Sequence, residues 1–78
     1  MKDYSEEYKI FLKSLGQNIR TFRSRKGLSQ EGLAFSIDSA RNFVGCIERA
    51  EKNLSLKTLF KIAKTLDIKV EDLLKDTM

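Results

Sequence analysis

Apolar residues recur every three or four positions along most of this chain, which is the spacing of helices with one buried face. The first and longest stripe predicts a helix over about residues 6–26, which Gly16 interrupts only weakly. This helix ends at Gly27, just past a basic last turn, as helix C-termini prefer. The stripe consists of Tyr8, Phe11, Leu12, Leu15, Ile19 and Phe22.

Two short helical patterns follow, and a polar turn separates them. Ser29 is typical of an N-cap and opens a helix of about two turns. Asp38 stands where the chain must reverse, and Asp tolerates left-handed backbone better than most residues. The next helix is expected to begin near Ser39 and to bury Val44 and Ile47.

Two more helical patterns occupy about residues 55–75. Ser55 can cap the first of them, and Asp67 separates it from the second. Their inward faces consist of Leu56, Leu59, Phe60, Ile62, Ala63 and Leu66, then Val70, Leu73 and Leu74. Five helices joined by short connections predict a compact all-α fold, with residues 1–78 as a single domain.

The charges of the chain favour a polyanionic partner. It carries 15 Lys and Arg against 11 Asp and Glu, a net charge of +4, which suits nucleic acid or an anionic membrane surface. No histidine accompanies the single Cys46, so no disulfide within the chain, no Cys/His metal site and no cofactor is expected. Residues 1–16 contain no uninterrupted apolar run, which argues against a signal peptide or a membrane span. We expect a soluble cytoplasmic protein with neither a membrane partner nor a small-molecule ligand.

A short helix, a tight turn and a second helix over about residues 29–49 are the pattern of a helix-turn-helix. In that motif the second helix is held across the first, so that its outer face can enter the major groove of DNA. The pattern therefore predicts a DNA-binding domain whose turn presents Arg41 and Asn42 at the start of the second helix.

A resemblance to a known family is carried by the segments "IRTFRSRKG", "LSQEGLA", "FVGCIER" and "NLSLKTLFKIAKTLDI". Over about residues 15–74 the chain resembles the Cro/CI-type (xenobiotic response element) helix-turn-helix regulators. Within that family, "ARNFVGCIERAEKNLSL" looks most like the controller proteins of type II restriction–modification systems. The resemblance implies a five-helix, lambda-repressor-like fold and a transcriptional regulator that binds a palindromic operator as a homodimer. RNA polymerase is a further candidate partner.

Three residues around the start of the second motif helix are candidates for reading bases. Arg41 and Asn42 are expected in its first turn, where Arg can bond both acceptors of guanine and Asn can pair bidentately with adenine. Cys46 occupies a position that contacts bases in relatives of the family. Gly45 either allows close approach to DNA or is a tolerated weak point. Each candidate also has a simpler interpretation, as an exposed polar or small residue on a helix surface.

Contacts to the DNA backbone are expected at the edges of the motif. Gln30 matches the family position that bonds a phosphate, and Ser29 is a second candidate whose role as a cap competes. Phe43 stands where controller proteins often carry Tyr. It lacks the hydroxyl group that could bond a phosphate, so the contact expected of it is apolar packing against DNA. Lys52 and Asn53 resemble the basic–Asn pair that touches DNA beside the recognition helix, and a solvated loop is the alternative for Lys52.

Several positions depart from the usual pattern of the family. Asp38 replaces the turn glycine, Ser39 replaces an apolar residue that plugs the turn, and Ala40 replaces the customary Ser or Asp cap. The cap of the second motif helix is then either Asp38 or Ser39. Ala50 stands where a glycine usually follows Glu-Arg, and Gly32 replaces a helix former inside the first motif helix.

The resemblance also implies a structural ion pair and a dimer surface. Arg23 and Glu48 would form a mostly buried pair that ties the first helix to the second motif helix, with no part in reading DNA. A homodimer would use apolar residues of the last two helices, for which closing the core is the alternative role. The candidates are Phe60, Ile68, Val70 and Leu73.

Functions of other classes stay open at this point. A helix-turn-helix fold kept as a protein-interaction module, such as an antitoxin or a phage-type repressor partner, predicts no salt-sensitive DNA binding. A membrane-surface role for the first helix is disfavoured because its polar face carries Glu6 and Glu7 beside lysines. We do not expect an enzyme, because the chain lacks histidine, a nucleophile motif and a phosphate-binding glycine loop.

Overall fold

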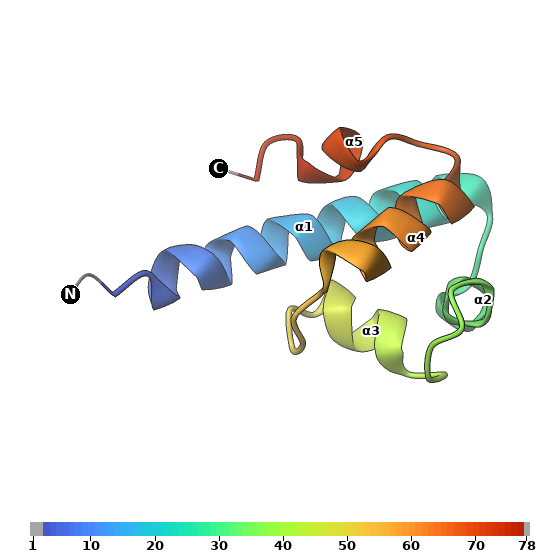
Figure 1. The fold of residues 1–78 in the computed structure, drawn as a ribbon, viewed down its shortest axis with the longest axis horizontal. Coiled ribbons are helices and arrows are strands. Elements are labelled where there is room, and N and C mark those ends of the chain that lie inside the picture. Colours follow the sequence, from blue (N-terminus) through green and yellow to red (C-terminus); the bar gives the residue numbers. More distant parts are fainter. Residues whose placement is uncertain (1–2, 78) are drawn as a thin grey trace.

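The computed structural model describes residues 3–77, which form five helices and, within that range, no strand (Figure 1). The prediction of an all-α fold with five helices is confirmed. The helices are α1 (Ser5–Lys26), α2 (Gln30–Ser36), α3 (Phe43–Glu48), α4 (Leu56–Leu66) and α5 (Val70–Leu74).

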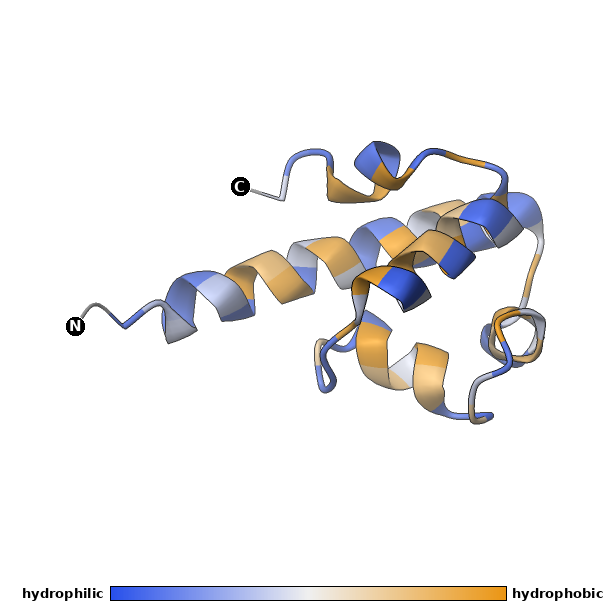
Figure 2. Cartoon of the chain, viewed as in Figure 1, coloured by the Kyte–Doolittle hydropathy of each residue, from blue (hydrophilic) through white to orange (hydrophobic). Residues whose placement is uncertain are grey.

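The longest helix, α1, is the central element of the fold, because α3, α4 and α5 all pack against it. The helix α2 closes one end by contacting α3 and α4. Figure 2 shows apolar and polar residues interspersed along α1 and α4, as expected of helices with one buried face. The buried apolar core consists of Leu15, Ile19, Leu33, Ala34, Ile37, Val44, Ile47, Leu59, Ile62, Ala63, Leu66 and Leu73.

Three helix ends follow the local chemistry of the sequence. Ser29 Oγ accepts a hydrogen bond from the Gly32 N–H at 2.9 Å, and Ser55 Oγ accepts one from the Thr58 N–H at 3.0 Å. Each bond satisfies an N–H group that has no partner within its helix. Gly27 ends α1 in the left-handed region, with a φ of 78°. The caps predicted at these positions are confirmed.

The expected start of α3 near Ser39 is wrong, because α3 begins at Phe43. Asp38 does reverse the chain, with a φ of 55°. The Ser39 side chain then bonds backwards to α2, since its hydroxyl donates to the Ala34 carbonyl at 3.2 Å. That hydroxyl therefore caps no helix, and the chain forms a turn closed by the Phe43 N–H and the Ala40 carbonyl before α3 begins.

Close packing of α1 and α3 depends on Gly16. A Cβ atom at this position would lie 2.7 Å from the carbonyl oxygens of both Ile47 and Glu48. No side chain fits between the two helices there, because real Cβ atoms do not approach backbone so closely. Gly16 is therefore a contact point rather than only an interruption of the helix.

The helix α5 lies on α1 and is fixed by a polar contact as well as by the core. Asn18 Nδ2 donates to the carbonyl oxygens of Leu73 and Lys75, both at 2.9 Å. Leu73 is 0% exposed, so it has no surface to offer a partner and its assignment to a dimer surface is wrong. Phe60 is 56% exposed, and Ile68 and Val70 are half-buried against the core.

The first half of α1 extends beyond the other helices (Figure 1), and the molecule measures 41 × 23 × 19 Å. Tyr4, Tyr8 and Ile10 are exposed on this extension. None of the described helices combines the length and the apolar content that crossing a membrane requires.

Candidate nucleic-acid interface

The helix α3 is held across α2 by its buried face and by a polar junction beneath it. Val44 and Ile47 are both buried, as the sequence predicts. Gly45 is buried too, and a Cβ atom there would lie 3.2 Å from Gln30 Oε1 and 3.1 Å from Arg49 Nη1. The small size of Gly45 therefore lets the Gln30 side chain lie against α3.

A buried ion pair joins α1 to α3. Arg23 Nε donates to Glu48 Oε2 at 2.7 Å and Arg23 Nη2 donates to Glu48 Oε1 at 3.1 Å, with side-chain exposed fractions of 11% and 3%. Arg23 Nη1 also donates to the Leu28 carbonyl at 2.8 Å. The pair that the resemblance implies is thus present, and it fixes the position of α3 rather than facing outward.

Gln30 belongs to the same junction, although the sequence places it on the DNA backbone. Its Nε2 donates to Glu48 Oε1 at 2.9 Å, and the residue is half-buried. One N–H of the Gln30 amide is therefore occupied inside the protein, which orients the side chain from α2 toward α3.

Arg41 and Asn42 are exposed, but they lie in the turn before α3 and not in its first helical turn. Asn42 is the N-cap residue of α3, and its side chain makes no capping bond. The guanidinium of Arg41 pairs with Glu31 of α2, with 2.7 Å between Arg41 Nε and Glu31 Oε2. Cys46 is half-buried, one turn into α3.

The residues expected on the DNA backbone differ in how free their side chains are. The Ser29 hydroxyl is used in capping α2, and Phe43 packs against the core from a half-buried position. Lys52 is exposed in the loop after α3. Asn53 is exposed beside it and accepts a hydrogen bond from the Tyr8 hydroxyl at 2.9 Å.

A third ion pair lies at the end of α3. Arg49 Nε donates to Glu51 Oε2 at 3.0 Å and Arg49 Nη2 donates to Glu51 Oε1 at 3.2 Å. These hydrogen bonds lower the pKa of Glu51 and raise the pKa of Arg49, so both groups are charged at neutral pH. The pair organises the beginning of the loop that carries Lys52 and Asn53.

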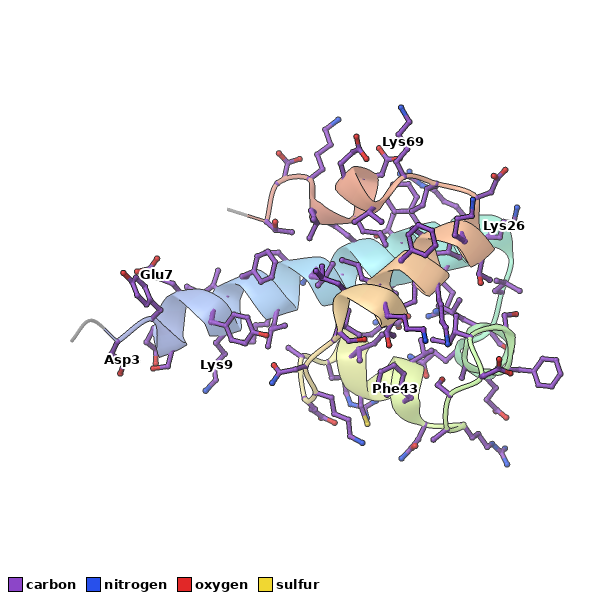
Figure 3. All side chains as sticks on the ribbon, viewed as in Figure 1. Asp3, Glu7, Lys9, Lys26, Phe43 and Lys69 are labelled. Carbon is purple, nitrogen blue, oxygen red and sulfur yellow. The ribbon has the colours of Figure 1, made fainter. Side chains whose placement is uncertain are left out.

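Basic and polar side chains thus gather in the segments just before and just after α3, whereas α3 itself carries no basic residue. In Figure 3, nitrogen-tipped side chains extend from this region, on the opposite side of the molecule from α5. Sequence reasoning missed the partners of two of these residues, which are Glu31 for Arg41 and Tyr8 for Asn53. Neither contact follows from helical spacing, because each joins residues of two different elements.

Comparison with known proteins identifies the motif. A family model described as "Helix-turn-helix" matches residues 19–73, which include all of α2, α3 and α4. The chain belongs to the helix-turn-helix family. Control protein C.BamHI of Bacillus amyloliquefaciens is 43% identical over 63 residues, which cover 80% of this chain and 78% of that protein. Control protein C.SmaI of Serratia marcescens is 42% identical over 60 residues, covering 77% and 71% of the two chains.

A solved structure supports the same assignment. The crystal structure of the restriction-modification controller protein C.AhdI from Aeromonas hydrophila superposes with a TM-score of 0.76 and 45% identity. The match covers 80% of this chain and 94% of that one. This helix-turn-helix protein is a DNA-binding regulator of transcription, and the similarity to restriction–modification controller proteins that the sequence indicates is confirmed.

Proposed function

We propose that this protein controls a restriction–modification system by binding an inverted-repeat operator as a homodimer. Its similarity to control proteins over most of its length supports the choice of system. The single observation that carries the proposal is the way α3 is attached to the rest of the fold. The buried Arg23–Glu48 pair fixes α3 to α1, while Arg41 and Asn42 are exposed at the N-terminal end of α3.

Arg41 and Asn42 read bases in this proposal. Residues at the N-terminal end of a recognition helix are the ones that reach base edges in the major groove. Because Glu31 occupies Nε of Arg41, the two terminal nitrogens form the open fork, which suits the two acceptors of guanine. Asn42 offers an unused amide for adenine, and Cys46 lies one turn further along α3.

The phosphate contacts come from the loop after α3 and from the start of α2. Lys52 supplies a positive charge and Asn53 an amide donor, while Ser29 and Gln30 stay candidates at the start of α2. Phe43 lacks a hydroxyl group, so it offers DNA only an apolar contact. These contacts fix the register of α3 on the duplex without reading sequence.

The homodimer is proposed to form through the exposed apolar side chains of α4 and α5. Phe60 is the most exposed candidate, and Ile68 and Val70 lie beside it on the rim of the same surface hollow. This surface is distinct from the buried site of Leu73. We propose that two copies related by a two-fold axis bind half-sites about 10 bp apart, one turn of DNA, as dimeric helix-turn-helix proteins do. RNA polymerase is proposed as a further partner on the resemblance alone.

Titration of operator DNA with three variants tests the division of roles. We expect Arg41→Ala to lose about 1–3 kcal/mol of discrimination at one base, because its bidentate contact is removed. Lys52→Ala should weaken binding to every sequence and reduce the slope of log K against log salt by about 1. Lys26→Ala, which removes the same charge at the end of α1, is the control. Equal effects of Lys52→Ala and Lys26→Ala would contradict the assignment of Lys52.

A further inference from the structure

The first half of α1 touches the loop between α3 and α4 through one hydrogen bond. The Tyr8 hydroxyl donates to Asn53 Oδ1 at 2.9 Å, although 45 positions separate the two residues. Tyr8 lies outside residues 19–73, to which the family model extends. The helix-turn-helix pattern therefore does not account for this contact.

The position of the Tyr8 side chain is restrained by its packing on Phe11. Its ring stacks on that of Phe11, with 6.1 Å between the centroids and 24° between the planes. Phe11 packs in turn against the buried core. Stacked aromatic rings restrain each other, and Tyr8 lies on the same uninterrupted helix, α1, as buried core residues. The Tyr8 hydroxyl therefore has a defined position.

The loop that receives this bond has an anchor at each end. Arg49 pairs with Glu51 where the loop begins, and Leu54 packs against the core where it ends. Lys52 and Asn53 lie exposed between these anchors. Within residues 3–77, the bond from Tyr8 is the side-chain hydrogen bond that holds this middle part.

We propose that Tyr8 is a positioning residue for DNA binding, which orients the Asn53 amide toward the DNA backbone. The inference rests on the proposed contact of Asn53 with phosphate. Because Oδ1 accepts the hydrogen bond from the Tyr8 hydroxyl, the amide nitrogen is the free end of Asn53, and phosphate oxygens accept hydrogen bonds from N–H donors. A loop held before binding also loses less conformational freedom when the complex forms.

Tyr8→Phe is the direct test, because it removes a single hydroxyl group and keeps the aromatic stack. We expect it to weaken binding about threefold to tenfold, both to a duplex selected from random-sequence DNA and to a scrambled duplex of equal length. The slope of log K against log salt should not change, because a neutral amide displaces no counterion. Tyr4→Phe is the matched control, since Tyr4 is exposed at the start of α1 and its hydroxyl makes no hydrogen bond to residues 3–77.

A double-mutant cycle shows whether Tyr8 acts through Asn53. Asn53→Ala alone should weaken binding to a similar extent, and adding Tyr8→Phe to it should cause no further loss. Urea unfolding of each variant establishes that the compared proteins are folded in the binding assay.

Three results with the variants would overturn the inference. If Tyr8→Phe binds like the parent while Asn53→Ala binds more weakly, Asn53 contacts DNA without help from Tyr8. If Tyr8→Phe causes the same loss with and without Asn53, Tyr8 acts elsewhere. If Asn53→Ala and Lys52→Ala bind like the parent while Arg41→Ala does not, the loop makes no DNA contact. A parent protein that selects no DNA at all would instead refute the proposed function, and this inference with it.

Discussion

Ala50 turns the chain after α3 with a φ of 60°, in the left-handed region of backbone conformation. This conformation brings Cβ close to a carbonyl oxygen and costs an L-residue roughly 1–2 kcal/mol. Aspartate accommodates it better, and Asp38 and Asp67 are among the other described residues with positive φ. The short polar side chain of aspartate can form a local hydrogen bond in this conformation, whereas the methyl group of alanine cannot. Ala50 therefore carries local strain.

Ala50→Gly should therefore raise the free energy of unfolding by about 1 kcal/mol. Relief of the left-handed strain exceeds the extra entropy that glycine gives to the unfolded chain. Ala40→Gly is the control, because Ala40 is exposed outside the helices and its φ is not positive, so it should lose about 0.5–1 kcal/mol. Urea unfolding measures both changes, and a loss of stability in Ala50→Gly would refute the explanation.

A methyl group added at Gly16 should have the opposite effect. Its carbon would lie 2.7 Å from two carbonyl oxygens of α3, so α1 and α3 must move apart. We expect Gly16→Ala to lower the free energy of unfolding by about 1–3 kcal/mol, the usual range for overpacking, despite the better helix propensity of alanine. Ser24→Ala, at an exposed position of the same helix, should change it by less than about 0.5 kcal/mol. Similar changes in the free energy of unfolding for the two variants would show that α1 and α3 can move apart at Gly16 without loss of stability.

At the scale of the elements, the attachment of α3 to α1 depends on Glu48. Glu48→Ala leaves the Arg23 guanidinium buried without its carboxylate and should cost about 3–5 kcal/mol. Glu31→Ala breaks an exposed pair with Arg41 and should cost less than about 1 kcal/mol. Urea unfolding at low temperature compares the two variants. Equal costs would mean that leaving the Arg23 guanidinium without its carboxylate carries no penalty from burial.

Local chemistry explains which elements could be predicted from the sequence. The caps at Ser29 and Ser55 and the stop at Gly27 depend on neighbouring residues, so the end of α1 and the starts of α2 and α4 follow from the chain itself. The start of α3 does not, because the Ser39 hydroxyl can bond forward to a helix or back to Ala34, and only the fold decides between them.

Contacts between elements explain what could not be predicted about the site. An apolar residue at helical spacing is equally suited to a core and to a dimer surface, and only the packing of α5 on α1 decides that Leu73 is buried. The partners of Arg41 and Asn53 also lie on other elements. The motif predicts which residue types form the candidate interface, whereas the orientation of their side chains requires the structure.

At the scale of the whole molecule, the proposed dimer depends on the surface around Phe60. Phe60→Glu places a charge in the proposed contact and should convert dimer to monomer without unfolding, because the side chain is already half exposed. Phe35→Glu changes an exposed phenylalanine on α2 and should leave the dimer intact. Sedimentation velocity distinguishes the species. A dimer that persists in Phe60→Glu would place the contact on another surface.

Selection of random-sequence duplex DNA on the parent protein tests the central claim most directly. The account predicts enrichment of an inverted repeat whose half-sites are centred about one helical turn apart, since two copies of α3 would enter successive major grooves on one face of the duplex. Enrichment of no common sequence, or of a single site without a repeat, would contradict a dimeric operator-binding regulator.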